Sequence, residues 1–299
     1  MKTELERASR AREFRGVVAS ITASILFGII FFLPPKLGPL SGEEIIAWRV
    51  VFVLPMALLI FALNKQLRDV KVIWQRVMRK PVLRAMLVID AVLFAVQLWL
   101  FGWAPKHGHA LDAALGYLLL PLVMVALGVV VHREKVTPLR GVAIASAVVG
   151  VVAAIVTTGS ISWVTLVVAI GYPLYFLNRR HWKLDTSGAM IFELLIILPA
   201  MIYFLASRHS VETLTQSPEL IPIVLILGLL SGVALTVYLA ASSMLPFGLF
   251  GLLSYLEPVL LVLVSVFLLG EALTPADVFI YGPILLALAF LGAESLRKS

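Results

Sequence analysis

Four charged residues lie inside long apolar stretches of this sequence, where charge is least expected. Arg49, Asp90, Glu193 and Glu257 each have hydrophobic residues on both sides. A charged side chain near the centre of a bilayer costs roughly 2.5 to 3.5 kcal/mol, so each one needs a partner or a purpose. We take Arg49 and Glu193 as candidates for solute binding or gating. The alternative is that each only holds neighbouring helices together.

Asp90 begins a stripe of side chains along one helical face. Asp90, Phe94, Gln97 and Phe101 recur at the spacing of helical turns, which predicts that this face points into the protein interior. A carboxyl group on an interior face can accept and release a proton, and an amide beside it can bind a solute. We therefore predict that Asp90 is a proton-coupling residue and that Gln97 contacts the solute.

Glu257 lies on a second stripe, with Phe250, Ser254 and Leu261. Pro258 follows it directly, and a proline inside a helix frees the carbonyl group one turn upstream. A broken helix that lines a cavity can offer this carbonyl to a solute or a proton. Glu257 is therefore the second proton-coupling candidate, and a neutral glutamic acid bonded to a neighbour is the alternative.

Aromatic residues within the apolar stretches can stack against a flat or amphiphilic solute. The candidates for this role are Trp48, Trp99, Trp103, Tyr117, Tyr175 and Tyr255. We assign it to Trp48, Tyr117 and Tyr255, and the alternative is that many of these aromatic residues only anchor the interface or face lipid. His107 and His109 lack a third ligand, so we predict no metal site. The sequence contains no phosphate-binding loop and no hydrolase or metalloprotease motif, so we predict neither a cofactor nor an enzyme.

The composition places these residues in a membrane. Hydrophobic residues make up 61% of the 299 residues and charged residues 14%, which excludes water as the main solvent. About twenty apolar residues cross a bilayer as a helix. Polar breaks divide the chain into ten such spans, near 16–33, 44–63, 82–104, 110–131, 139–158, 161–178, 187–206, 220–240, 246–269 and 275–294.

The distribution of Lys and Arg predicts the orientation. Of the 24 basic residues, 20 fall in the termini and loops of one side, three in the loops of the other side, and Arg49 in a span. The positive-inside rule then places both termini in the cytoplasm of a multi-pass protein of the plasma (inner) membrane. Topology and anionic headgroups account for the net charge of +7, so we predict no nucleic-acid partner.

A motif repeats along the chain and predicts the architecture. Pro121, Glu134, Thr137 and Pro138 recur at the same spacing as Pro258, Glu271, Thr274 and Pro275. The offset corresponds to five spans, an odd number, so the second copy is inverted relative to the first. We predict an all-α membrane protein with two five-helix repeats, residues 1–158 and 159–299, around a central cavity. Small residues at Ser146, Gly150 and Ala154, and at Gly228 and Gly232, predict packing seams, with a homodimer contact as the alternative.

The chain resembles the EamA-type transporters of the drug/metabolite transporter superfamily, and among them the RarD-type permeases. The motifs are Glu44-Ile45 with Arg49, Trp103-Ala104, Leu111-Asp112 through Gly116-Tyr117 and Pro121, Glu193 through Leu198-Pro199, and Tyr255, Pro258 and Gly270-Glu271. The resemblance implies ten helices in two inverted halves and the movement of small metabolites, with Lys36, Glu44, Arg49, Asp112, Tyr117, Glu193 and Tyr255 as the family-like polar set. The sequence departs from the pattern at Gln97, Leu120 and Glu257.

The predicted function is a secondary transporter of small organic metabolites or drugs, coupled to ions or protons and working by alternating access. Two alternatives stay open, a membrane-embedded enzyme acting on lipid-linked substrates and a channel or scaffold. The charges are spread over four spans rather than clustered as a catalytic pair, which favours the transporter.

Overall fold

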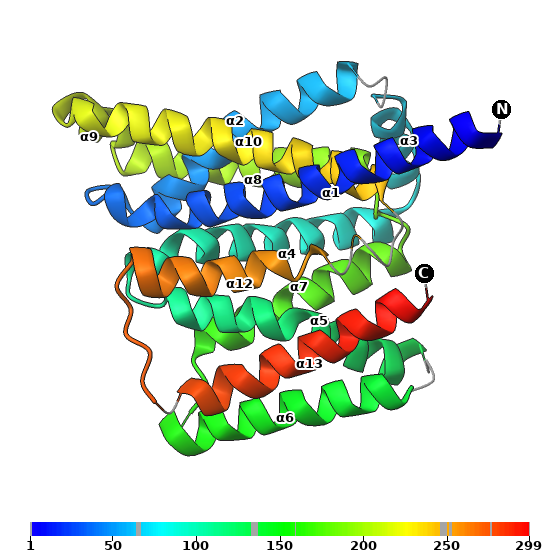
Figure 1. Ribbon diagram of the computed structural model, residues 1–299. Coiled ribbons are helices and arrows are strands. Elements are labelled where there is room, and N and C mark those ends of the chain that lie inside the picture. Colours follow the sequence, from blue (N-terminus) through cyan, green and yellow to red (C-terminus); the bar gives the residue numbers. More distant parts are fainter. Residues whose placement is uncertain are drawn as a thin grey trace. The chain divides into compact units, whose positions relative to one another are not determined.

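The computed structural model describes residues 2–63, 67–132, 137–158, 160–245, 250, 253–275 and 277–298. Over these ranges the chain forms helices joined by turns, and they contain no strand (Figure 1). The all-α class predicted from the sequence is therefore confirmed for this part of the chain.

Each predicted span contains a helix. The long helices are α1 (Lys2–Phe32), α2 (Gly42–Leu63), α4 (Pro81–Lys106), α5 (Ala110–His132), α6 (Pro138–Thr158), α7 (Trp163–His181), α8 (Ser187–Ser207), α10 (Ile221–Met244) and α13 (Asp277–Lys298). The shorter ones are α3 (Leu67–Arg79), α9 (Ser210–Gln216) and α12 (Leu256–Leu263), the 3₁₀ turns η1 (Pro34–Lys36) and η2 (Pro218–Leu220), and the π-helical turn η3 (Val264–Leu268) that extends α12. The ninth predicted span begins at residues 246–249, which lie outside the described part.

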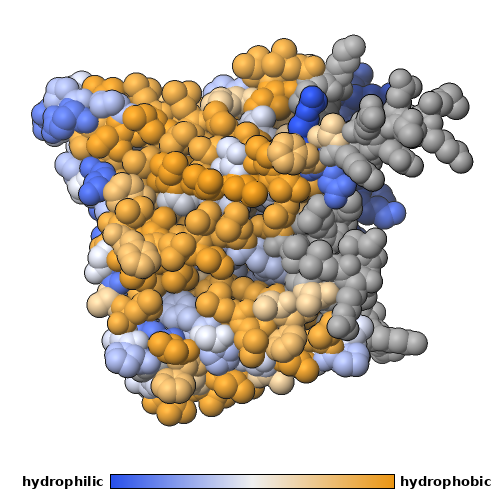
Figure 2. Space-filling view, viewed as in Figure 1, coloured by the Kyte–Doolittle hydropathy of each residue, from blue (hydrophilic) through white to orange (hydrophobic). Residues whose placement is uncertain are grey.

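In the described part of the chain, six helices are long and apolar enough to cross a membrane. They cover Ala11–Lys36, Gly42–Leu63, Pro81–Lys106, Ala110–Leu127, Gly188–Ser207 and Pro218–Ser242. Shorter apolar helices cover Gly141–Thr157, Leu256–Leu268 and Asp277–Phe290, whereas α7 belongs to neither group. Figure 2 shows hydrophobic side chains along the visible helices. The chain is a multi-pass membrane protein, and ten crossings stay a prediction.

The helices form two compact units. One contains residues 1–29, 108–169 and 234–299, and the other contains residues 30–107 and 170–233. Each unit takes segments from both halves of the sequence. The division at residue 158 concerns the sequence repeat rather than these units, and it stays a prediction.

Small residues form the seams within each unit. In the first unit, a Cβ atom on Gly150 of α6 would lie 2.8 Å from the carbonyl oxygen of Ile280 on α13, so the two helices approach closely. In the second unit, Cβ atoms on Gly228 and Gly232 of α10 would lie 2.3 Å from Phe52 and Met56 of α2. The packing seams predicted at these glycines are confirmed.

Candidate functional site

The second unit contains a buried polar cluster centred on α7. Tyr175, Asn178 and Arg179 lie at positions i, i+3 and i+4, so they share one face of this helix. Tyr175 is 5% exposed and Arg179 is 8% exposed. The three side chains bond to carboxylates on α4 and α8, the two helices that contribute Asp90 and Glu193.

Glu193 is bound on both of its oxygens. The hydroxyl group of Tyr175 donates to Oε2 at 2.8 Å, and Nη1 of Arg179 donates to Oε1. Arg179 also donates to the Tyr175 oxygen at 2.7 Å and to the carbonyl oxygen of Thr186 at 3.0 Å. Glu193 is fully buried. Its charge is therefore held by an ion pair and a hydrogen bond in a closed triad.

Asp90 lies against the same helix but is less completely bonded. Its Oδ1 atom accepts a hydrogen bond from the amide of Asn178 at 2.8 Å. Its Oδ2 atom is buried and has no hydrogen-bond partner among the described residues, and the residue is 0% exposed. A buried carboxylate oxygen without a partner is costly, so this atom needs a proton or a cation from outside the chain.

The stripe predicted along α4 does face the interior. Phe94 stacks on Tyr175 with ring centroids 5.6 Å apart, and Gln97 is 1% exposed. A Cβ atom on Gly171 of α7 would lie 2.0 Å from the amide nitrogen of Gln97, so the end of the Gln97 side chain packs directly on the backbone of this glycine. Phe101 is 4% exposed and packs edge to face on Phe31 at 5.0 Å.

Arg49 contacts other groups of the same unit. It is 6% exposed, its Nε atom donates to the hydroxyl group of Ser231 at 3.1 Å, and its guanidinium lies 5.3 Å from the centre of the Phe101 ring. These contacts join α2 to α10 and α4. The indole nitrogen of Trp48, one residue earlier, donates to the hydroxyl group of Ser210 at 3.0 Å.

The first unit contains the remaining predicted residues. Tyr117 is 8% exposed on α5, and Tyr255 packs against an apolar cluster of α5, α6 and α13. Glu257 lies in the first turn of α12. A turn at Ser254 and Tyr255 comes just before this helix, and the role predicted for Glu257 stays a prediction.

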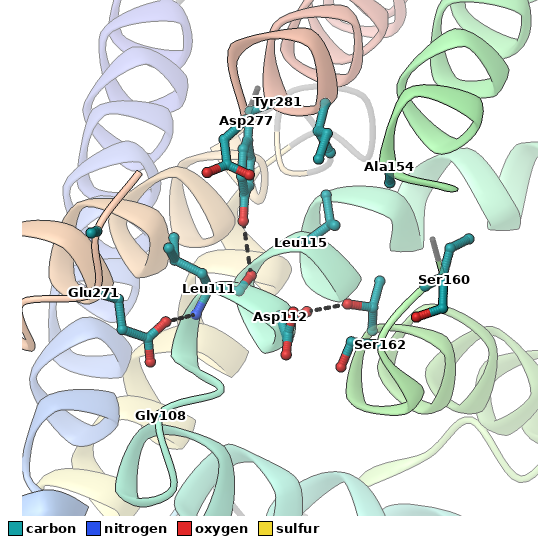
Figure 3. A pocket seen from close by; sticks show the side chains of 14 residues that line it. Gly108, Leu111, Asp112, Leu115, Ala154, Ser160, Ser162, Glu271, Asp277 and Tyr281 are labelled. Carbon is teal, nitrogen blue, oxygen red and sulfur yellow. Dashed lines mark hydrogen bonds between the residues drawn. The ribbon is translucent and has the colours of Figure 1, made fainter. Parts of the chain in front are cut away.

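A cavity of about 360 Å³ also lies in the first unit (Figure 3). Three carboxylates and several hydroxyl groups line it: Asp112, Glu271, Asp277, Ser160, Ser162, Thr165 and Tyr281. The carboxylates have local partners. Both oxygens of Glu271 accept from the backbone N–H groups of Ala110 and Leu111, at 2.7 and 2.6 Å. Asp112 bonds to His109 and Asp277 bonds to Thr274. Glu271 therefore caps the start of α5, and the acidic lining is structural.

Within the described ranges no group of three or more His, Cys, Asp or Glu residues could hold a metal ion. The roles predicted for the eight candidate residues stay predictions. The structure brings only Asp90, Gln97 and Glu193 to the α7 face.

Sequence reasoning named Tyr175 as an aromatic residue that could stack against a solute, but it missed Asn178 and Arg179 on α7. Arg179 was expected in the loop 179–183, but that expectation was wrong, because α7 continues to His181 and the side chain is buried against Glu193. A signal was available in the sequence. Tyr175, Asn178 and Arg179 share one face at the end of an apolar stretch, and such a face needs polar partners on its neighbours.

Comparison with known proteins identifies relatives over nearly the whole chain. The chain is 40% identical over 286 residues to the chloramphenicol-sensitive protein RarD of Pseudomonas aeruginosa, covering 95% of both proteins. It is 36% identical to an uncharacterized transporter of Pasteurella multocida, over 95% of this chain and 97% of that one. No family model matches. A solved crystal structure, 16% identical, superposes with a TM-score of 0.58 over 94% of this chain and 99% of that one, which supports the fold alone.

Proposed function

Because this chain belongs to the RarD-type permeases, a family of transporters, we propose that it is a secondary transporter of small organic metabolites or drugs. In this proposal it works in the plasma membrane, with both termini in the cytoplasm. Ten helices in two inverted repeats alternate between the two faces around a central site. The observation that carries the proposal is the buried polar cluster on α7, where Glu193 pairs with the Arg179 guanidinium and Asp90 bonds to the Asn178 amide.

The charges of this cluster support coupling to protons. Asp90 and Glu193 would contribute two negative charges, whereas Arg179 contributes one positive charge. An unbalanced charge among membrane-spanning helices is costly, so one proton or one cation completes the cluster. Since Glu193 already has two partners and Asp90 has a bare oxygen, we assign the exchangeable proton to Asp90. Glu257 is the second candidate.

The cluster also supports a role of Glu193 as a gate. The carboxylate joins α8 to α7, and a charged solute that competes for Arg179 would separate the two helices. Arg49 joins α2 to α10 through a hydrogen bond to Ser231. Contacts that a solute can replace are the kind that allow helices to move during alternating access.

Uptake into proteoliposomes with an imposed pH gradient tests the proposal. Chloramphenicol and a panel of small neutral and zwitterionic solutes are the probes. We expect saturable uptake that needs the protein and that the gradient accelerates. Asp90→Asn should remove the acceleration, and Glu193→Gln should reduce uptake itself. Uptake without saturation would indicate a channel, and normal gradient-driven uptake by both variants would refute the assigned roles.

Labelling of introduced cysteines tests the orientation, because the chain has no cysteine of its own. Lys71 and Lys36 are both exposed. In intact cells a membrane-impermeant maleimide should label Lys36→Cys but not Lys71→Cys. The reverse result would place the termini outside the cytoplasm.

A further inference from the structure

The helix α3 has an outward face, and none of the residues proposed above for transport lies on this helix. It follows α2, which ends at Leu63, and precedes α4, which begins at Pro81. Both α2 and α4 are long and apolar enough to cross a membrane. The end of one span and the start of the next lie on the same side of the bilayer, so α3 lies at the surface of one leaflet.

Contacts within the second unit fix the rotation of α3 about its axis. Ile73 and Val77 are 2% and 5% exposed and pack against apolar residues of α4 and α8. Arg76 donates to two carbonyl oxygens of the turn between α7 and α8, at 2.8 and 3.1 Å. A Cβ atom on Gly188 would lie 2.8 Å from the carbonyl group of Asp69, so the start of α3 is tightly docked. The face opposite these contacts points away from the protein.

Apolar and basic side chains lie side by side on the outward part of α3. Trp74 stacks on Phe192 at 5.7 Å yet is 50% exposed, and Met78 is 44% exposed. Lys71 is exposed and lies at helical spacing from both, three residues before Trp74 and seven before Met78. Arg68 and Arg79, also exposed, lie three residues before and eight residues after Lys71.

We propose that Arg68, Lys71, Trp74, Met78 and Arg79 form a binding surface for anionic phospholipid. The indole group of Trp74 and the thioether of Met78 enter the boundary between headgroups and acyl chains, while the three basic side chains bind lipid phosphates. Helices that lie in the plane of a membrane divide their surface in this way. Asp69 is the only acidic residue of α3, and its backbone is docked on Gly188. Each basic side chain near an anionic surface raises the affinity by about fivefold.

Quenching of Trp74 fluorescence by brominated lipids tests this surface. The purified protein is reconstituted in nanodiscs with brominated phosphatidylglycerol or brominated phosphatidylcholine at equal mole fractions, and the Trp74→Phe spectrum is subtracted to isolate Trp74. We expect the anionic lipid to quench at roughly tenfold lower mole fraction than the zwitterionic lipid, well below the roughly hundredfold difference that three independent side chains would give. The triple variant R68Q/K71Q/R79Q should remove most of this preference.

The double variant K36Q/R208Q is the matched control, because both side chains are exposed basic groups outside α3. It should keep the preference for phosphatidylglycerol. Equal quenching of the wild-type protein by the two lipids would overturn the proposal, and so would a preference that survives in the triple variant. Absence of quenching by either lipid would show that Trp74 does not reach the bilayer. The comparison of the two lipids on the wild-type protein tests the proposal even where a variant folds poorly.

Discussion

Replacing Arg179 by Gln should destabilise the protein far more than the same change at Arg180. The two residues are adjacent on α7, but Arg179 is buried and bonded to Glu193, Tyr175 and Thr186, whereas Arg180 is exposed. Removing the Arg179 guanidinium leaves the fully buried Glu193 carboxylate without its counter-charge. The difference between the two variants therefore isolates the cost of an unpaired buried charge.

The expected magnitude follows from the contacts. Breaking a buried ion pair by removing one partner costs about 3 to 5 kcal/mol. The hydrogen bond from Tyr175 to Glu193 is present in both the wild type and the variant, so it does not offset this loss. We expect a loss of about 3 kcal/mol or more for Arg179→Gln at neutral pH. Arg180→Gln should change the free energy of unfolding by less than about 0.5 kcal/mol.

Denaturant unfolding in detergent micelles, followed by circular dichroism, measures this difference. The double variant R179Q/E193Q removes both charges and should be at least about 1 kcal/mol more stable than R179Q alone. Acidic pH should also reduce the defect of R179Q, because a proton on Glu193 then removes the unpaired charge. If R179Q is no less stable than R180Q, or if the second substitution adds to the first, the ion pair does not stabilise this unit.

Three further outcomes are expected. Asp90→Asn should fold normally, because an amide replaces a carboxyl group that is neutral in our proposal, yet its uptake in proteoliposomes should no longer respond to a pH gradient. Gly171→Ala should cost at most about 1 kcal/mol in unfolding experiments, because the new Cβ atom would lie 2.0 Å from the amide nitrogen of Gln97 and displace the end of this flexible side chain, and Gln97→Ala should remove that cost. Glu271→Ala should cost about 1 to 2 kcal/mol by leaving two backbone N–H groups of α5 without an acceptor.

The positions of the long helices could be predicted, because the hydropathy of a stretch depends only on the residues in that stretch and not on its contacts in the fold. Long apolar runs with polar breaks give most of the long helices to within a few residues, although α1 begins well before its predicted span and α3 and α9 lie in predicted loops. The glycine seams follow from the spacing of small side chains. Gly150 and Gly228 illustrate this, since a backbone without a side chain is where another helix approaches. The inward stripe of α4 follows from the same helical geometry.

Partners of the buried charges could not be predicted in the same way. Arg179 and Glu193 lie on two helices joined by a turn, and Arg49 meets Ser231 across a far longer stretch of sequence. Which side chains meet depends on how the helices rotate and cross, and hydropathy carries no information about either. The counting of basic residues in loops also treats Arg179 and Arg180 alike, although only one of them is buried.

A buried ion pair that only holds helices together and one that opens during transport differ in a way that stability alone does not show. Replacing both charges of a structural pair with neutral groups is often tolerated, so R179Q/E193Q should fold under either interpretation. If the pair only holds the helices together, this stable double variant should also transport solute at the normal rate. If the pair is a gate, the double variant should stay folded while uptake fails. The reason is that its neutral side chains have no ion pair that a charged solute could replace. Stability and uptake measured on the same double variant therefore separate the two roles of Glu193.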